Sequence, residues 1–197
     1  MHTSGGKLPM TWYPQAYVAK VSMTNMDMRA DPTRGYPGRT YRFYKGPTVF
    51  PFGAGFSYTR FNQHLVSAPT TISVPTLHSN LEGNNATTMK KNAVRTKHIK
   101  CESLDLNMHI DVKNIGDMDG THTILIFSIP SYTRMKQLIT FEKVYVVAGA
   151  QQRVKINMNI CKHFSIADEY GIRRIFMGEH KIHVGEDLRH SITFQAP

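Results

Sequence analysis

One stretch decides the fold class of this chain: Leu104-Asp105-Leu106-Asn107-Met108-His109-Ile110-Asp111-Val112. Every second residue in it is apolar. Side chains in a β-strand point alternately to opposite faces. This pattern therefore produces one apolar face that can be buried and one polar face that is exposed to solvent. Strands of this kind are typical of antiparallel sheets that cover a core on one side. The stretch therefore predicts a half-buried strand in a β-domain.

Further strand patterns follow at regular intervals downstream. Residues 124–127 are apolar on both faces, as in the central strand of a sheet. The other candidates are residues 144–147, 154–160, 175–177, 182–184 and 192–194. About seven short strands separated by turns predict an immunoglobulin-like antiparallel sandwich of two sheets, assigned here to residues 101–197.

Residues 62–100 are polar and rich in turn formers. We interpret them as an extended lead into the sandwich, followed by a loop. Asn85 begins an Asn-Ala-Thr sequon and is therefore a candidate glycosylation site. The sequon is consistent with a surface loop of a secreted protein, although such sequons also occur by chance.

The net charge of +10 includes one dense basic cluster, which lies within residues 90–100. A solvated linker explains it most simply, and attraction to an acidic polysaccharide is a second explanation. Nucleic acid is disfavoured as a partner, because no groove-reading element accompanies the charge. No apolar run approaches the ~20 residues of a membrane-spanning helix, so a membrane role is not expected.

Few periodic elements occur before residue 62. Leu8, Met10 and Trp12 alternate with other residues and predict one short strand. No second strand pattern lies near it, so we expect its partner to lie outside this chain.

Residues 35–61 crowd tyrosines and phenylalanines among glycines and arginines. They include Gly-Tyr-Pro-Gly-Arg-Thr-Tyr-Arg-Phe-Tyr and Phe-Pro-Phe-Gly-Ala-Gly-Phe-Ser-Tyr-Thr-Arg-Phe. Gly and Pro recur every few residues, which argues against a regular helix or strand. The segment is interpreted as an ordered aromatic connector between two domains.

These motifs resemble glycoside hydrolase family 3, and they occur in that family's order. Residues 6–14 and 23–29 resemble the last strand and following loop of its α/β sandwich domain, and residues 35–61 resemble its connector. Residues 114–120 and 164–185 resemble its C-terminal fibronectin type III-like domain. The resemblance is closest to the plant β-D-xylosidase and α-L-arabinofuranosidase branch.

The resemblance implies a division of the chain into four parts. Residues 1–34 would be a remnant of the α/β sandwich domain and residues 35–61 the connector. Residues 62–100 would be the lead and polar loop, and residues 101–197 the fibronectin type III-like domain. The fold class expected is mainly β.

In function, the resemblance implies a retaining hydrolase with two catalytic carboxylates, which cleaves xylose or arabinose from wall oligosaccharides. Both carboxylates belong to upstream domains, so this chain is expected to be inactive alone, with no catalytic residue and no cofactor. The upstream catalytic domains are then its expected partners. An independent carbohydrate-binding or inhibitory module remains the alternative.

Location and cysteine pairing follow from the same resemblance. The family is secreted, which implies the cell wall or apoplast, although the first residues carry no signal-peptide pattern. The residues alone leave Cys101 and Cys161 either as a disulfide or as two buried free thiols, since a zinc site would need four clustered ligands. An oxidising, secreted setting favours the disulfide.

The fourteen carboxylates and ten histidines do not converge in the sequence. Most carboxylates fall in turns or on a wet strand face, where little raises a pKa as acid catalysis requires. Asp27 lies in a family motif, and we expect it to pair with Arg29 or Arg39. His180 and His183 point to opposite faces of one strand, so no metal site is expected there.

Arg39, Tyr41, Arg42 and Tyr44 are the remaining candidates for function. Sugar-binding surfaces use flat aromatic rings for packing and guanidinium groups for hydrogen bonds. The same residues could instead attach the connector to a neighbouring domain.

Overall fold

The computed structural model describes residues 5–77, 93–132, 135–168, 170–185 and 187–197. Asn85 and the lysines of the basic cluster at residues 90 and 91 lie outside this part of the chain. The strands are β1 (Phe61–Ser67), β2 (Thr71–Ser73), β3 (Ala93–Arg95), β4 (Asp105–Asn114), β5 (Gly120–Pro130), β6 (Gln137–Val146), β7 (Gln151–Asn159), β8 (Ile166–Ala167), β9 (Arg173–Phe176), β10 (Gly178–Val184) and β11 (Leu188–Gln195). The helical turns are η1 (Gln15–Tyr17), η2 (Pro32–Arg34), α1 (Thr40–Phe43), η3 (Thr96–His98) and α2 (Ile160–His163).

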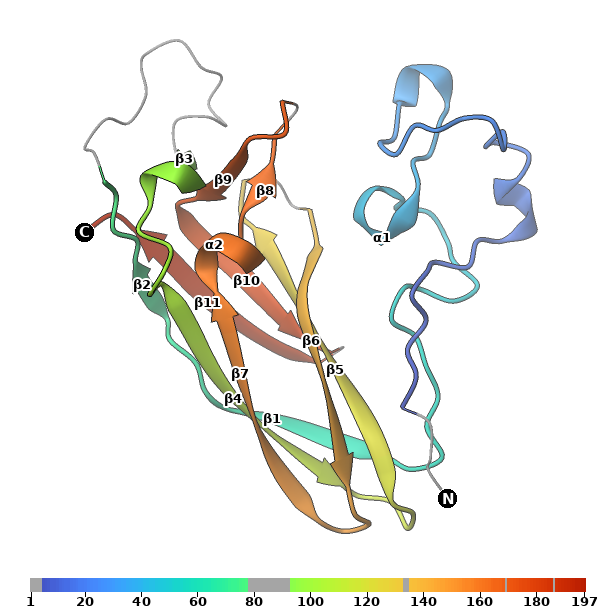
Figure 1. Cartoon of the computed structure of the whole chain (residues 1–197). Helices are drawn as coiled ribbons and strands as arrows, with labels where there is room; N and C mark the ends of the chain where they lie inside the picture. Colours follow the sequence, from blue (N-terminus) through green and yellow to red (C-terminus); the bar gives the residue numbers. More distant parts are fainter. Residues whose placement is uncertain (1–4, 78–92, 133–134, 169, 186) are drawn as a thin grey trace.

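Two sheets make the predicted sandwich. One has the strand order β1-β4-β7 and the other the order β2-β11-β10-β5-β6, while β3, β9 and β8 form a small third sheet. All paired strands are antiparallel except β2, which runs parallel to β11. Figure 1 shows the long strands β4 to β7 extending together toward one end of the molecule. The mainly β fold class is confirmed.

The sheets include strands from the segment that we interpreted as an extended lead. β1 pairs with β4 over Phe61–Ser67, and β2 pairs with β11. Both are edge strands, and in β1 only Phe61 and Leu65 pack against the core. Such a strand buries too few apolar side chains to show a clear alternation in the sequence.

The core lies between the two large sheets. Its fully buried side chains include Leu106, Met108 and Ile110 from β4, together with Ile156 and Met158 from β7. The alternation predicted for residues 104–112 is confirmed, because these side chains lie on the face that points into the core. Asp111 lies on the opposite face and is also buried. Arg153 covers it and donates two hydrogen bonds to its carboxylate, at 2.7 and 2.9 Å.

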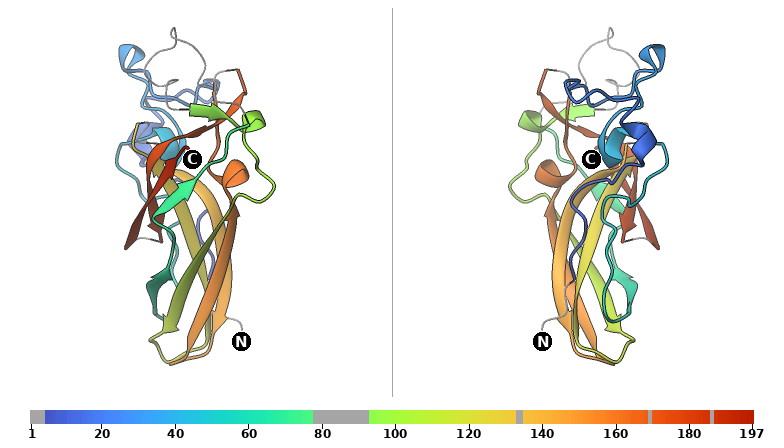
Figure 2. Two further views of the ribbon diagram at one scale, coloured as in Figure 1. Left: turned by 90° about the vertical axis from the view of Figure 1, so that its left-hand side faces the viewer. Right: turned by 90° about the vertical axis from the view of Figure 1, so that its right-hand side faces the viewer.

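β5 is apolar on both faces, as its sequence indicated. Ile124 and Ile126 point into the core, and the alternation places Leu125 and Phe127 on the opposite face. Phe127 is only 3% exposed because the N-terminal segment, residues 5–60, covers that face. In Figure 1 and Figure 2 this segment (blue to cyan) lies beside the sandwich rather than within it.

Leu8–Trp12 is not a regular strand, but it pairs with the connector through an isolated antiparallel bridge between Trp12 and Phe50, so the expectation of a partner outside this chain was wrong. Trp12 N donates to Phe50 O at 2.8 Å, and Leu8 N donates to Ala54 O at 2.8 Å. Gly53 N donates back to Leu8 O at 2.9 Å. The partner is the connector itself, where prolines and Gly53, which has a φ of +82°, limit the pairing to these few hydrogen bonds.

The N-terminal segment also contacts β5 directly. Thr123 Oγ1 donates to Gly5 O at 2.6 Å. A Cβ on Gly53 would lie 2.6 Å from Leu125 Cδ1, so a glycine allows the connector to approach the sheet this closely.

The disulfide Cys101–Cys161 is present, which confirms the pairing expected for a secreted protein. It joins the residues before β4 to helix α2, across a sequence separation of 60 residues. Ser165 Oγ donates to Cys161 O, and Asn159 Nδ2 donates to Cys101 O, so hydrogen bonds support both half-cystines.

His180, which is buried, and His122, which is half-buried, both have a lowered pKa. His180 Nε2 donates to Phe176 O at 2.8 Å, so its Nδ1 accepts from Ser128 Oγ at 3.2 Å. Burial lowers the pKa of His180. Burial, with a smaller effect of Lys7, lowers the pKa of His122 from 6.5 to about 4.

The disulfide should be a major contributor to stability. Replacing both Cys101 and Cys161 by serine should lower the free energy of unfolding by about 4 kcal/mol, because the denatured chain regains the entropy of a loop of this length. Urea unfolding of both forms measures the difference. Reductant should destabilise the wild type and leave the double variant unchanged; equal stability of the oxidised wild type and the variant would contradict the prediction.

Stability should fall as the pH falls from 6.5 toward 4. The pKa of His122 is lower in the folded than in the unfolded chain, so below 6.5 the unfolded chain binds the extra proton and is favoured. His122→Gln should flatten this part of a thermal-unfolding profile, whereas His190→Gln controls for loss of a histidine in general. An unchanged slope for His122→Gln would refute the assignment.

Candidate functional site

Helix α1 is a single turn in the connector with a strained start. Thr40 has a φ of +61°, and it is the only non-glycine residue in the described part of the chain with a positive φ. Its backbone N–H donates to Tyr13 Oη at 2.7 Å. Tyr13, Tyr17 and Tyr44 pack as a cluster of rings with centroids 4.0 to 5.2 Å apart, which holds the turn in place.

Arg39 forms its hydrogen bonds within the N-terminal segment. Its Nε donates to Tyr36 Oη at 3.0 Å, and its Nη2 donates to Ser22 O at 3.1 Å and to Asn25 O at 2.6 Å. These bonds fix the loop that precedes the connector, so the guanidinium group of Arg39 is already engaged.

Tyr41 joins the connector to the sandwich. Its ring stacks on Phe52 with centroids 4.3 Å apart and meets Phe127 edge-on at 5.8 Å. Its hydroxyl accepts a hydrogen bond of 2.9 Å from Leu138 N. Leu138 lies on β6, an edge strand, so the tyrosine satisfies a backbone donor that the sheet leaves unpaired.

Arg42 and Tyr44 flank that contact. Arg42 Nη2 lies 3.5 Å from Gln137 Oε1, and its guanidinium group lies over the Phe43 ring at 5.4 Å from the centroid. Tyr44 Oη donates to Pro47 O at 2.9 Å. The four residues identified from the sequence are therefore divided between the N-terminal segment (Arg39 and Tyr44) and the junction with the sandwich (Tyr41 and Arg42).

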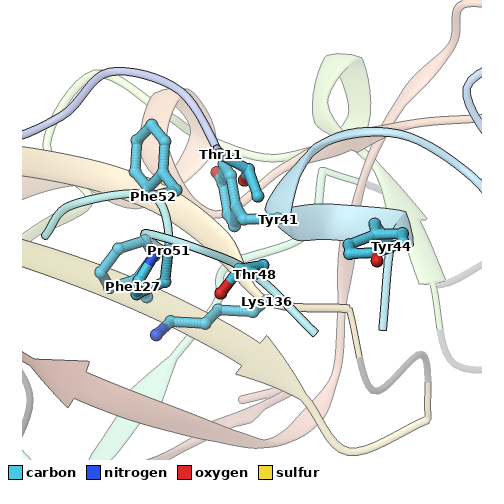
Figure 3. A pocket seen from close by; sticks show the side chains of 8 residues that line it. All are labelled: Thr11, Tyr41, Tyr44, Thr48, Pro51, Phe52, Phe127 and Lys136. Atoms are coloured by element: carbon cyan, nitrogen blue, oxygen red, sulfur yellow. The ribbon is translucent and has the colours of Figure 1, made fainter. Parts of the chain in front are cut away.

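A pocket of about 200 Å³ lies at this junction, as Figure 3 shows. It is lined by Thr11, Tyr41, Tyr44, Thr48, Pro51, Phe52, Phe127 and Lys136. Of these, only the two tyrosines were identified from the sequence. Phe127 could have been suspected from the two apolar faces of its strand, but Thr11 and Lys136 come from segments that only the fold brings together.

The pocket combines ring faces with polar groups. Lys136 Nζ lies 4.0 Å from the centroid of the Phe127 ring, a favourable cation–π contact. Thr11 is buried, and its Oγ1 has no hydrogen-bond partner among the described residues. Thr48 is exposed at the rim.

Asp27 pairs with Arg34 at 2.9 Å, so the expectation of Arg29 or Arg39 as its partner was wrong. Arg34 also contacts Asp31 at 2.6 Å. Hydrogen bonds from Thr33 and Arg34 lower the pKa of Asp31 from 3.8 to about 2. Arg39 is unavailable to Asp27 because backbone carbonyls occupy its guanidinium group.

The other carboxylates with perturbed pKa values are also shifted toward the ionised form. Arg153 lowers the pKa of Asp111, and Arg174 lowers that of Asp168. The Ala148 N–H lowers the pKa of Asp119, and Ser191 lowers that of Glu179. A general acid for glycoside cleavage needs a raised pKa, which is the opposite direction.

His109 and His122, which could have met across a sheet, make separate contacts. His109 Nδ1 lies 3.0 Å from Ser67 Oγ on the three-stranded sheet, whereas His122 Nε2 lies 2.8 Å from Gln63 Nε2. Across the described residues, no three His, Cys, Asp or Glu side chains are placed to hold a metal ion. Within the same residues, no helix has the length and apolarity needed to cross a membrane.

Comparisons with known proteins identify close relatives. Residues 130–188 match the family model for a fibronectin type III-like domain. Beta-D-xylosidase 1 of Arabidopsis thaliana is 50% identical over 201 residues, which cover 97% of this chain and 25% of that protein. Beta-xylosidase/alpha-L-arabinofuranosidase 2 of Medicago sativa subsp. varia is 44% identical over 98% of this chain and 24% of its own length.

Solved structures show the same fold. The GH3 exo-β-xylosidase XlnD matches with a TM-score of 0.76 at 21% identity, over 99% of this chain and 25% of that one. The β-D-glucoside glucohydrolase of Trichoderma reesei matches with a TM-score of 0.68 at 18% identity, over 98% of this chain and 27% of that one. The chain thus spans about a quarter of the length of the relatives that it matches. In sequence and in fold, it corresponds to the C-terminal portion of a glycoside hydrolase family 3 enzyme.

Proposed function

We propose that this chain is part of a secreted β-xylosidase-like glycoside hydrolase that releases xylose or arabinose from cell-wall oligosaccharides. The observation that carries the proposal is 50% identity to a plant β-D-xylosidase over nearly the whole of this chain. The expected site of action is the cell wall or apoplast, and the disulfide is compatible with that oxidising compartment.

The role that we assign to this part of the enzyme is structural. The N-terminal segment presents apolar side chains to solvent, including Met23, Met26, Phe56 and Tyr58, which are 88, 85, 87 and 78% exposed. Exposed apolar groups gathered in one segment mark an interaction surface. We assign that surface to contact with the remainder of the parent enzyme, the upstream catalytic domains, and assign Tyr41 and Phe52 to the contact with the sandwich.

Hydrolysis itself is assigned to residues outside this chain. A retaining glycosidase needs two carboxyl groups about 5 to 5.5 Å apart, one of them protonated at working pH. Asp27 and Asp31 both pair with Arg34, and the pKa of Asp31 is lowered to about 2. With so low a pKa, Asp31 is ionised at working pH and cannot supply a proton.

Activity assays and intact mass test this proposal together. The purified chain should not hydrolyse aryl β-D-xyloside or aryl α-L-arabinofuranoside, and the protein from its source tissue should be active and much larger than 22.4 kDa. Turnover by the isolated chain that Asp27→Asn abolishes would contradict the structural role. A mature tissue protein of about 22.4 kDa without activity would instead favour the stand-alone module.

A further inference from the structure

The pocket beside α1 has a wall built from three aromatic rings. Tyr41 and Phe52 stack on each other, and Phe127 meets both edge-on, with centroids 5.8 and 6.2 Å away. The N-terminal segment supplies two of the rings and β5 supplies the third. Because the rings hold one another, the wall is formed before any ligand arrives.

Polar groups from two separate segments line the same pocket. Thr48 lies at the exposed rim, and no hydrogen bond to its hydroxyl occurs within the described part of the chain. Tyr44 Oη donates to Pro47 O, which leaves its lone pairs as acceptors. On the sandwich side, the ammonium group of Lys136 lies over the Phe127 ring.

Thr11 adds a second observation that points to a ligand. Its side-chain oxygen is buried without a partner among the described residues, an arrangement that costs about 1–3 kcal/mol. Rotation about χ1 moves the hydroxyl to another staggered position, where a ligand hydroxyl in the pocket could satisfy it. The nearby backbone strain at Thr40 is the kind that accumulates at binding sites.

We propose that this pocket binds a single neutral pyranose ring. Aromatic faces pack against the C–H face of a sugar, and the hydroxyl groups of Thr48 and Tyr44 match the mixed donors and acceptors at the ring's edge. The volume of about 200 Å³ is below the roughly 300–1,000 Å³ of pockets for drug-sized ligands, so the space suits one ring rather than a chain.

The same chemistry disfavours an acidic sugar. Aromatic faces carry partial negative charge and repel a carboxylate. The ammonium group of Lys136 is already held over the Phe127 ring at 4.0 Å, which satisfies part of its charge.

Titration of the 197-residue chain with methyl β-D-xylopyranoside, followed by NMR, tests the proposal. The choice of a pentose rests on the proposed function, whereas the ring-binding chemistry rests on the pocket. We expect saturable shifts with a Kd of about 1–10 mM, a typical affinity for so small a ligand. Resonances of Tyr41, Thr48 and Phe52 should shift, and those of the outer face of β7 should not.

Matched variants separate binding from folding. Thr48→Val and Tyr44→Phe each remove one hydroxyl group with little change of shape and should raise Kd about 3- to 10-fold. Thr193→Val makes the same substitution at an exposed position on β11 and should leave Kd unchanged. Phe52→Ala should abolish binding, but the two hydroxyl variants carry the test if that variant unfolds.

Three outcomes would overturn the proposal: no saturable shift up to about 0.1 M glycoside, a Kd that neither hydroxyl variant changes, or tighter binding of methyl β-D-glucuronide than of the neutral glycoside. None of them bears on the mass or activity of the tissue enzyme. A failed titration therefore leaves the proposed function standing, and the converse also holds.

Discussion

The structure depends on a strand that is apolar on both faces. Ile124 and Ile126 of β5 fill the sandwich core, so Leu125 and Phe127 must face away from it. Leaving a phenylalanine and a leucine uncovered in the middle of a sheet would cost about 1.5–3 kcal/mol for each side chain. The N-terminal segment removes this cost by placing Phe52, Gly53 and Tyr41 against that face. The segment and the sandwich therefore stabilise each other.

The same constraint explains how the polar groups of the connector are distributed. Arg39 saturates backbone carbonyls of its own segment, and Tyr41 Oη accepts from the edge strand at Leu138. These hydrogen bonds position the connector against the sheet. The hydroxyl groups left over, Thr11, Thr48 and the acceptor side of Tyr44, border the pocket between the two parts. A candidate site thus arises where the connector meets the sheet.

Much of the sandwich could be predicted from its sequence, because a strand with one buried face has an apolar residue at every second position. β4 and β7 show this alternation, and β5 shows the continuous apolar run of a doubly covered strand. β1 could not be recognised, since an edge strand buries few side chains. The pairing of Leu8–Trp12 with the connector was missed because Pro51 and Gly53 interrupt the partner, and backbone hydrogen bonds leave no side-chain pattern.

The candidate site was harder to predict, because it depends on contacts between distant segments. The aromatic connector drew attention to Tyr41 and Tyr44, but Phe127 and Lys136 lie about ninety residues away in the sequence. Asp27 illustrates the same limit at short range. Its partner is Arg34 rather than Arg29 or Arg39, because the loop folds back and Arg39 is engaged by carbonyl groups.

The most direct test of mutual support between connector and sheet is amide hydrogen exchange at Leu8 and Trp12 in two glycine variants. Gly53→Ala and Gly149→Ala introduce the same kind of strain, at φ values of +82° and +73°, but only the first places a Cβ 2.6 Å from Leu125. The account predicts that Gly53→Ala speeds exchange at both amides by about tenfold, equivalent to about 1.4 kcal/mol of local stability, while Gly149→Ala leaves them unchanged. Equal exchange in the two variants would contradict it.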